Sequence, residues 1–331
     1  MTGFWQAKQV LVTGAGGFIG SHLVETLLAR GAKVRGFVRY TSRQDPGMLR
    51  QLSTEDFSKI ELIAGDLRDE QAVRQAVKDC QIVFHLGALI SIPYSYRHPV
   101  EVASTNFMGT LNILTACLDS GVERLVHTST SEVYGTARRV PIAESHPLQG
   151  QSPYSASKIG ADKLAESFFC AYDLPVVTVR PFNTFGPRQS ARAVIPTIIT
   201  QALVNDTLKL GNLAATRDFT YVADTVDGFI RAAEAQGVEG QLFNLGTGAE
   251  ISIGELAGQI IRMLHRPVEI RMDSERLRPD ASEVQRLLSD NSSAAQRLDW
   301  RPAHTLEQGL EHTIAWIREH LELYRIGAYE Y

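Results

Sequence analysis

The sequence is poor in cysteine, with three among its 331 residues. Cys80, Cys117 and Cys170 lie far apart, and neither a Cys-x-x-Cys pair nor a Cys/His cluster accompanies them. This spacing argues against a zinc site and against a disulfide-stapled secreted domain. We therefore expect three free thiols in a reducing compartment and no metal.

Long apolar runs and a secretion signal are also lacking. The stretch 193–204 is interrupted by Pro196 and Gln201, and it falls short of the roughly 18 residues that a membrane helix needs. The N-terminus does not show the charged, apolar and small-residue regions of a signal peptide. The sequence therefore predicts a cytoplasmic protein without a membrane partner.

An excess of positive charge is missing as well. Asp and Glu total 37 against 33 Lys and Arg, which gives a formal net charge of −4. Nonspecific nucleic-acid binding needs a basic surface that displaces counterions, so we expect no nucleic-acid partner. The hydrophobic fraction of 44% is that of a globular protein, and the length fits two domains or one large one.

What is present is an alternation of short apolar strands with helical segments. Strands are expected at 9–12, 33–38, 60–63, 82–85, 124–127 and 176–180, and helices at 20–30, 70–78, 99–120 and 154–172. Such alternation indicates βαβ units and a parallel α/β sheet of the doubly wound, Rossmann type. After residue 180 the pattern is broken by Gly and Pro, with helices at 253–264 and 305–324. We therefore expect a first domain at 1–180 and a smaller α/β lobe at 181–331, with a return of the chain to the first domain left open.

A glycine-rich turn follows the first strand. Gly14, Gly17 and Gly20 stand in GxxGxxG spacing at the start of the first helix, where bare backbone N–H groups can approach a pyrophosphate. This context predicts a dinucleotide site.

The second strand lacks the acid that NAD sites use to bind the ribose hydroxyls. Arg39 and Arg43 stand there instead and can pair with a 2′-phosphate, which favours NADP over NAD. Asp66, after the third strand, is placed to accept from the adenine amino group or, alternatively, to cap a helix.

Tyr154 and Lys158 lie four residues apart, and hence on one face of a helix. An ammonium beside a phenol lowers the phenol pKa, so the tyrosinate can act as a base. Ser129 and Thr130, after the fifth strand, place hydroxyls upstream of this pair.

These features together resemble the extended short-chain dehydrogenase/reductase family over nearly the whole chain. The matching segments are TGAGGFIG (13–20), GDL (65–67), HLGA (85–88), NFMGTLNIL (106–114), STSEVYG (129–135), YSASK (154–158), RPFNTFGPRQ (180–189), TRDFTYVADT (216–225) and the stretch 278–300. The resemblance implies a tightly bound NAD(P), a C-terminal lobe that binds a nucleotide-diphosphate sugar, and a homodimer through helices near 100–118 and 154–171. It also extends the dinucleotide contacts to Phe18, Ile19, Leu67, Leu86 and Ala88.

Within that family, Glu132 resembles the carboxylate of sugar-nucleotide 4,6-dehydratases, where a base removes the proton from carbon 5. Thr130-Ser131-Glu132 is similar to the GDP-mannose 4,6-dehydratases, whereas dTDP-glucose 4,6-dehydratases carry Thr-Asp-Glu. With Ser131 in place of that Asp, the acid that protonates the leaving 6-hydroxyl is open between Ser131, a water and Glu132. Tyr154, Lys158 and Thr130 are implied to act at the 4-hydroxyl.

The same Ser-Glu pair appears in UDP-glucuronate decarboxylases, which remain an alternative, as does an NDP-sugar 4-epimerase with an incidental glutamate. A noncatalytic nucleotide-binding regulator is disfavoured by the intact Thr130, Tyr154 and Lys158. The stretches 85–106 and 182–199 look closer to bacterial dehydratases of UDP- or GDP-N-acetylglucosamine in legionaminic-acid-type surface-polysaccharide pathways. This subgroup is therefore the preferred substrate assignment.

The substrate contacts implied by the resemblance lie mainly in the second half of the chain. Asn183, Arg217 and Arg278 would hold the diphosphate, Arg192 is a weaker candidate, and Ser91 would touch the hexose. Asn106 is implied to support the catalytic lysine through the backbone. His85 and His127, at strand ends, are expected to be structural.

Overall fold

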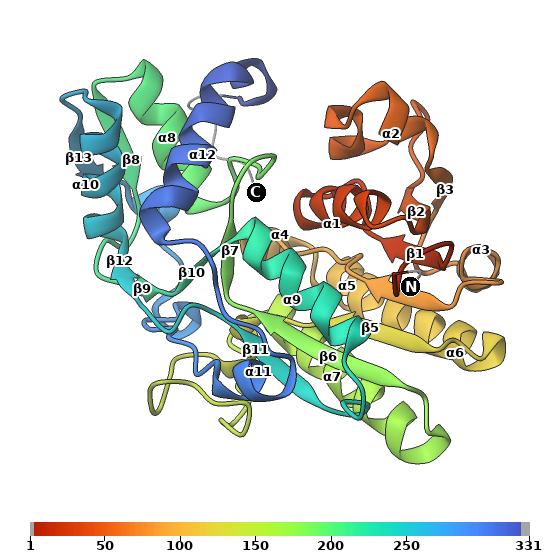
Figure 1. Ribbon diagram of the computed structural model, residues 1–331. Coiled ribbons are helices and arrows are strands. Elements are labelled where there is room, and N and C mark those ends of the chain that lie inside the picture. The colour runs from red at the N-terminus through yellow and green to blue at the C-terminus, as the bar shows by residue number, and fades with distance from the viewer. Residues whose placement is uncertain (1–2, 326–331) are drawn as a thin grey trace.

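A computed structural model describes residues 3–325, and seven parallel strands form its central sheet in the order β11-β6-β5-β4-β1-β2-β3 (Figure 1). These strands are Gln9–Thr13 (β1), Lys33–Arg39 (β2), Glu61–Gly65 (β3), Ile82–His85 (β4), Arg124–Thr128 (β5), Val176–Pro181 (β6) and Leu242–Leu245 (β11). The predicted doubly wound α/β fold is confirmed. Every strand expected from the sequence is present, with ends that differ by two residues at most.

The winding direction of the sheet reverses at β1, which lies between β4 and β2. In open α/β sheets, ligands bind at such a reversal, outside the carboxyl ends of the strands. Thr13, at the end of β1, and His85, at the end of β4, are joined there by a 2.8 Å contact between Oγ1 and Nδ1. The fold thus places the glycine turn at the expected position of a binding crevice.

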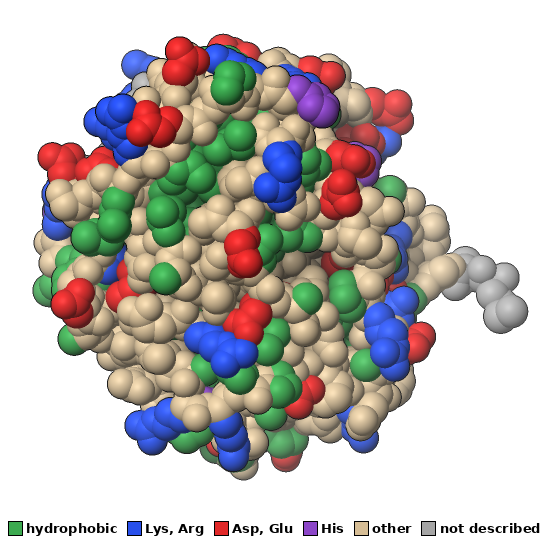
Figure 2. All heavy atoms as spheres, turned by 90° about the vertical axis from the view of Figure 1, so that its left-hand side faces the viewer, with side chains coloured by type: hydrophobic (Ala, Val, Ile, Leu, Met, Phe, Trp, Pro, Cys, Tyr) green, Lys and Arg blue, Asp and Glu red, His purple; other side chains and the backbone are tan. Residues whose placement is uncertain are grey.

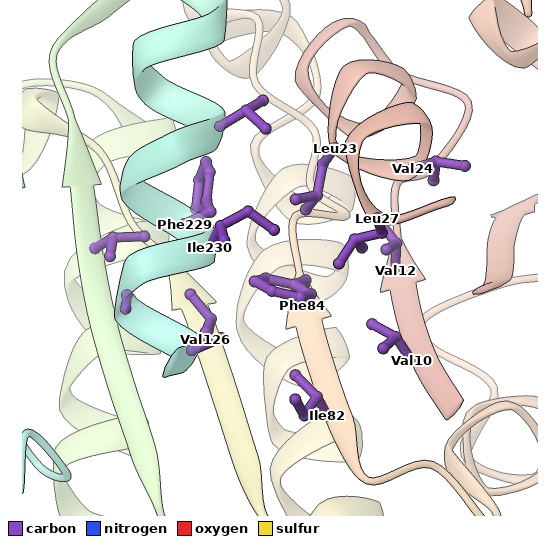
Figure 3. Packing of buried hydrophobic residues seen from close by; sticks show 14 of the residues in the cluster. Val10, Val12, Leu23, Val24, Leu27, Ile82, Phe84, Val126, Phe229 and Ile230 are labelled. Atoms are coloured by element: carbon purple, nitrogen blue, oxygen red, sulfur yellow. The ribbon is translucent and has the colours of Figure 1, made fainter. Parts of the chain in front are cut away.

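One face of the sheet is covered by helices from both halves of the chain. Phe229 and Ile230 on α9 (Val222–Glu234) join a buried cluster with Leu23 and Leu27 on α1 (Phe18–Ala29), over the strands (Figure 3). The other face is covered by α3 (Glu70–Val77), α6 (Gly109–Ser120) and α7 (Pro153–Tyr172). The central strands β1, β4, β5 and β6 are buried between these layers, which explains their near-continuous apolar sequences, whereas the edge strand β3 is largely exposed.

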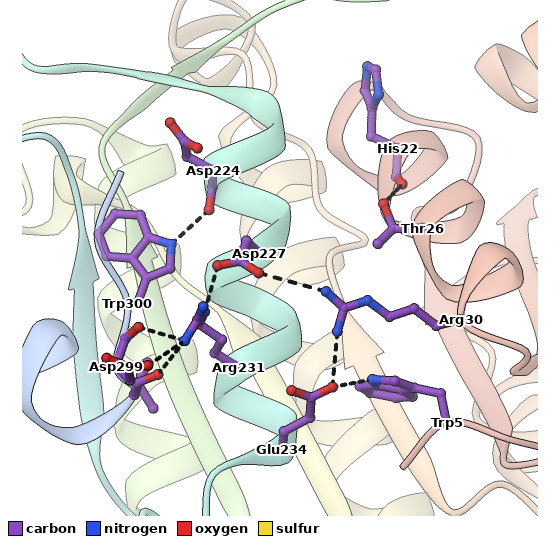
Figure 4. A network of polar contacts seen from close by, with 11 residues as sticks. Trp5, His22, Thr26, Arg30, Asp224, Asp227, Arg231, Glu234, Asp299 and Trp300 are labelled. Atoms are coloured by element: carbon purple, nitrogen blue, oxygen red, sulfur yellow. Dashed lines mark hydrogen bonds and ion pairs between the residues drawn. The ribbon is translucent and has the colours of Figure 1, made fainter. Parts of the chain in front are cut away.

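Polar contacts also tie α9 to α1. Arg30 on α1 lies 3.1 Å from Glu234 and 3.8 Å from Asp227, which also pairs with Arg231 at 2.6 Å (Figure 4). The indole of Trp300 donates to the backbone carbonyl of Asp224 at 2.9 Å. Helix α9 is therefore an integral layer of the first domain, although it lies within the second half of the chain.

The smaller lobe has its own core. Its helices are α8 (Val194–Val204), α10 (Ile253–Leu264) and α12 (Leu306–Glu319), and its strand pairs are β8 (Thr207–Leu210) with β13 (Glu269–Met272), β7 (Asn183–Phe185) with β10 (Phe219–Tyr221), and β9 (Thr216–Arg217) with β12 (Ile251–Ser252). On the face in Figure 2, basic and acidic side chains are interspersed. No helix within 3–325 is long and apolar enough to cross a membrane.

Some elements differ from the expectation. The predicted helix 99–120 consists of α5 (Pro99–Ala103), a π-helical turn at Ser104–Met108, and α6. The predicted helix 305–324 ends at Glu319 and is followed by a short 3₁₀ turn, Leu321–Leu323. Five helices were not among those expected: the longer α8 and α9, in the part of the chain broken by Gly and Pro, and the short α2 (Thr54–Ser58), α4 (Ile92–Arg97) and α11 (Ser292–Arg297). Periodicity over four to six residues is too short to predict the short ones.

Candidate active site

The residues after β5 supply the first part of the site. Thr130 has an extended backbone and caps the 3₁₀ helix Ser131–Tyr134, accepting the backbone N–H of Glu132 at 3.2 Å from its Oγ1. Ser131 is buried and Glu132 half-buried. The tight turn thus presents a hydroxyl and a carboxylate next to each other at the carboxyl end of the sheet.

Helix α7 supplies the second part. Ser152 caps it and forms a capping box with Ser155, and Pro153 occupies the first turn, where its missing N–H costs no hydrogen bond. These local signals start the helix so that Tyr154 lies in its first turn and Lys158 one turn later. Both side chains are buried.

Tyr154 and Thr130 meet through a side-chain hydrogen bond. Burial raises the pKa of Tyr154; the hydrogen bond from Thr130 opposes this, and the charge of Glu132 adds to it. The ammonium of Lys158 donates to the backbone carbonyl of Thr128 at 2.7 Å, and burial lowers its pKa to about 8. The expected lowering of the Tyr154 pKa by Lys158 is therefore not found, because burial of the phenol dominates.

Asp162, one further turn along α7, was missed by the sequence analysis. Its buried carboxylate lies 2.8 Å from both Ser129 Oγ and Arg180 Nη2, and 3.2 Å from His127 Nε2. Burial opposes its ionisation, but His127, Arg180 and Lys158 together lower the pKa of Asp162 to about 2. The i+4 spacing from Lys158 is the only sequence signal for this residue, and acids on helices are usually solvated.

The smaller lobe brings two predicted arginines to this site. Arg217 is buried and lies 3.3 Å from Glu283, a carboxylate that the sequence analysis did not single out. Burial lowers the pKa of Arg217, attraction to Glu132 raises it, and repulsion from Arg278 lowers it. These mutual effects bring Glu132, Arg217, Arg278 and Glu283 into one charged cluster between the two lobes.

Two of the predicted substrate contacts, Asn183 and Arg278, are among the residues that have a buried polar atom without a partner within 3–325. Neither Asn183 Oδ1 nor Arg278 Nη1 has a hydrogen-bond partner among residues 3–325. Buried polar groups are nearly always satisfied, so such atoms favour a polar ligand. Arg192 is exposed in the loop before α8, and its contact with substrate stays a prediction.

Two other predicted residues have structural contacts. Ser91 caps α4, accepting the backbone N–H of Tyr94 at 3.3 Å. Asn106, in the π-helical turn, holds the backbone of Leu89 through bonds of 2.8 and 3.0 Å, and donates to Ser157 Oγ at 3.0 Å. Its side chain therefore contacts Ser157, the residue beside Lys158, and not the lysine itself.

The glycine turn forms a cradle that side chains would fill. Gly14 has φ +69°, and a Cβ on it would come within 2.9 Å of the Gly87 backbone nitrogen. A Cβ on Gly20 would meet the Gly14 carbonyl oxygen at 2.2 Å. Gly17 caps α1 without a side-chain hydrogen bond, and the first helical turn contains no acid. This terminus suits a dinucleotide pyrophosphate, as predicted.

A cavity of about 140 Å³ continues from this turn along the ends of the strands. Gly14, Arg39, Asp66, Leu67 and Ala88 line it, five of the residues expected to contact the dinucleotide. Phe37, Arg68 and Thr105 also line it and were missed by the sequence analysis. Phe18, Ile19 and Leu86 flank the turn, and Arg43 is exposed on the loop after β2.

Asp66 has a partner that the sequence analysis did not foresee. Its carboxylate binds the guanidinium of Arg68 at 2.6 and 3.0 Å and accepts the backbone N–H of the same residue at 2.9 Å. The alternative of a helix cap was wrong, because Asp69 caps α3. Within 3–325, no group of three or more His, Cys, Asp or Glu side chains could hold a metal ion.

Comparison with known proteins agrees with this geometry. Residues 11–313 match the family model of GDP-mannose 4,6 dehydratase. UDP-glucose 4-epimerase of Mycolicibacterium smegmatis is 34% identical, with 94% of this chain and 98% of the relative covered. UDP-N-acetyl-alpha-D-glucosaminuronate decarboxylase of Bacillus cytotoxicus is 33% identical over the same shares.

Among solved structures, dTDP-glucose 4,6-dehydratase (DesIV) of Streptomyces venezuelae, with NAD and TYD bound, has a TM-score of 0.84 at 29% identity. The alignment covers 96% of this chain and 99% of that one. Family match, fold and the placement of Thr130, Tyr154 and Lys158 lead to one conclusion. The chain belongs to the GDP-mannose 4,6-dehydratase family, the NAD(P)-dependent sugar-nucleotide 4,6-dehydratases of the extended short-chain dehydrogenase/reductases.

Proposed function

We propose that the enzyme is a 4,6-dehydratase of a nucleotide-diphosphate hexose, with UDP- or GDP-N-acetylglucosamine as the preferred substrate. The observation that carries this proposal is the position of the Glu132 carboxylate. It follows Thr130 closely in the chain, and its negative charge contributes to the raised pKa of Tyr154. A 4-epimerase needs no carboxylate at this point, whereas water elimination needs a base for carbon 5. The substrate assignment is supported only by the resemblance of 85–106 and 182–199.

The first step is oxidation at carbon 4. Tyr154 acts as a phenolate that the Lys158 ammonium stabilises; it takes the proton of the 4-hydroxyl and becomes the phenol, while Thr130 hydrogen-bonds the reacting oxygen. A nicotinamide dinucleotide held by the glycine turn at Gly14, Gly17 and Gly20 would supply the acceptor for the carbon 4 hydride and its donor to carbon 6. The burial of Tyr154 and Lys158 keeps bulk water from these proton transfers.

The second step is loss of water across carbons 5 and 6. The 4-ketone acidifies the carbon 5 proton, Glu132 removes it, and the 6-hydroxyl leaves as water after taking a proton. Glu132, Ser131 and a water remain the candidates for that proton donor. Return of a hydride to carbon 6 and of a proton to carbon 5 gives the 4-keto-6-deoxy sugar, so the net change is the loss of one water.

Arg217, Arg278 and Asn183 would hold the substrate diphosphate. Guanidinium forks pair with phosphate oxygens, and the unpartnered Nη1 of Arg278 leaves a donor for them within the described residues. Asn183 would donate through its amide nitrogen. Glu283 orients Arg217 through its ion pair. A polyanion is thereby held by local cations, although the chain carries a net charge of −4.

For the dinucleotide we propose NADP over NAD, on the ground that Arg39 and Arg43 replace the usual acid after β2. Arg39 lines the cavity, which supports its contact with the adenosine ribose. We also propose a homodimer through α5–α6 and α7; Val100 on α5 and Met108 in the π-helical turn between α5 and α6 are 81% and 44% exposed. Light scattering of the purified protein tests the dimer. A cytoplasmic location in a surface-polysaccharide pathway stays a prediction.

The experiment that tests the function is incubation with UDP-, GDP-, CDP- and dTDP-sugars, followed by mass measurement of the products. Loss of water supports the 4,6-dehydratase and names the base and hexose. Loss of carbon dioxide from UDP-glucuronate would establish the decarboxylase, and an isomer of unchanged mass the epimerase. Release of stoichiometric reduced cofactor during turnover would contradict the proposal, because the hydride must return to the sugar.

A further inference from the structure

Helix α5 brings a carboxylate to the end of β2, where the strand itself supplies none. Glu101 Oε1 lies 3.3 Å from Nη2 of Arg39, the residue at the end of β2. The hydroxyl of Tyr94, on α4, donates to the other oxygen of Glu101 at 2.5 Å. The acid is therefore held at a fixed place by residues from two separate elements.

Glu101 belongs to a group of charged side chains beside the dinucleotide cavity. Arg39 and Arg68 attract its carboxylate, and Arg39 also acts on Asp66, which lines the same cavity. The hydrogen bond from Tyr94, followed by Arg39 and Arg68, holds the pKa of Glu101 below its usual range. At neutral pH Glu101 is thus a carboxylate. Its negative charge partly offsets the positive charge of Arg39, the residue expected to bind a 2′-phosphate.

This arrangement changes how Arg39 can act on a dinucleotide. A 2′-phosphate would have to compete with Glu101 for the guanidinium and would lie near a like charge, which is unfavourable. A free 2′-hydroxyl meets no such repulsion, and a carboxylate accepts hydrogen bonds from ribose hydroxyls.

We propose that Glu101 is a specificity-determining residue for the dinucleotide: its carboxylate restrains Arg39 and lowers the preference for NADP over NAD. The inference rests on the proposed dinucleotide site and concerns only the choice between its two forms. It is independent of the sugar and of the reaction, because Glu101 acts through Arg39, which lines the cavity at the end of β2.

The test is direct titration of NAD and of NADP, without sugar, into wild-type protein freed of bound nucleotide and into Glu101→Gln. We expect the ratio of NADP affinity to NAD affinity to rise about tenfold, mainly through tighter NADP binding; that is about 1.4 kcal/mol. The rise should shrink as salt is added, because Arg39 is largely exposed and its interactions are screened.

Two further variants separate charge from structure. Tyr94→Phe keeps the carboxylate of Glu101 but removes the hydrogen bond that holds it in place. We therefore expect the ratio of NADP affinity to NAD affinity to rise, but by less than in Glu101→Gln. Glu70→Gln, which removes an exposed acid paired with Arg74 on α3, is the matched control and should leave the ratio unchanged.

Equal changes in both affinities, or none, in Glu101→Gln would overturn the inference while the dehydratase proposal stands. Absence of binding of either dinucleotide to the wild type would overturn the cofactor site and this inference together. A failed dehydration assay with intact dinucleotide binding would count only against the proposed function.

Discussion

At the residue scale, the site combines groups whose charges are set by their surroundings. Burial raises the pKa of Tyr154, so the phenol stays protonated; burial lowers the pKa of Lys158 to about 8, and Asp162 is ionised despite its burial. Glu132 lies among them at the edge of the smaller lobe, in the field of Arg217. A reaction that passes through oxidation, elimination and reduction requires neighbouring groups in different protonation states.

Glu132→Gln should separate the two halves of the reaction. The amide keeps the size of the side chain but cannot take the carbon 5 proton, so we expect oxidation at carbon 4 to persist and water loss to fall by about 10²–10⁴-fold, as for a lost general base. Reduced-cofactor absorbance in single turnover and product mass measure the two steps. Unimpaired water loss would exclude Glu132 as the base.

Asp162→Asn should shift the pH profile. Lys158 loses its proton as the pH rises through about 8, so activity that needs the ammonium declines above that pH. The Asp162 carboxylate favours the charged lysine, so its removal should lower the Lys158 pKa further and move this alkaline limb to lower pH. The pH dependence of kcat measures the shift.

Ser129→Ala is the control for that experiment. It removes one hydrogen bond to Asp162 but leaves the negative charge in place. A merely structural role of Asp162 predicts that both variants lose activity with the same pH profile. A positioning role through charge predicts that the limb moves only in Asp162→Asn.

At the element scale, turns and caps decide where the chemistry sits. The glycine turn before α1 packs its backbone against Gly87 after β4, and the capping box at Ser152 starts α7 one residue before Tyr154. Both signals are local; the sequence analysis used the glycine turn but not the capping box. The π-helical turn within 99–120 was not predicted, because it changes hydrogen-bond register without a change in composition.

Gly20→Ala should weaken dinucleotide binding severely. The added Cβ would lie 2.2 Å from the Gly14 carbonyl oxygen, so the turn must move away from the position that receives the pyrophosphate. We expect at least a tenfold loss of dinucleotide affinity by titration, with the circular dichroism spectrum retained. Gly254→Ala on α10 is the control, since its Cβ would make only an ordinary contact of 3.5 Å.

At the scale of the whole molecule, the chain crosses between its two lobes. After building β7 and α8 in the smaller lobe, it returns through α9 and β11 to the central sheet, and then leaves again for α10. Tyr221, at the start of α9, packs against the cores of both lobes. The lobes are therefore expected to unfold together.

Phe243→Ala tests this coupling. The ring is fully buried on β11, and its removal should cost about 3–5 kcal/mol of unfolding free energy. Denaturant unfolding should be followed by separate single-tryptophan proteins that retain Trp5 in the first domain or Trp316 in the smaller lobe. We expect both transitions to shift equally.

The matched control is Leu62→Ala on the edge strand β3, where the side chain is 37% exposed and the cost should be much smaller. A shift of the Trp5 transition alone in Phe243→Ala would show that the lobes unfold independently.

The parallel α/β sheet, the glycine turn and the Tyr154/Lys158 pair could be predicted before the structure was known, because each depends on spacing within short stretches of chain. The packing of α9 and β11 onto the first domain, the contacts of Asp162 with His127 and Arg180, and the pairing of Glu101 with Arg39 became visible in the folded chain. Those contacts join segments far apart in the sequence, through packing that no local periodicity records. Burial decided the charges too, since desolvation of Tyr154 and Lys158 depends on the atoms that surround them and not on their neighbours in the chain.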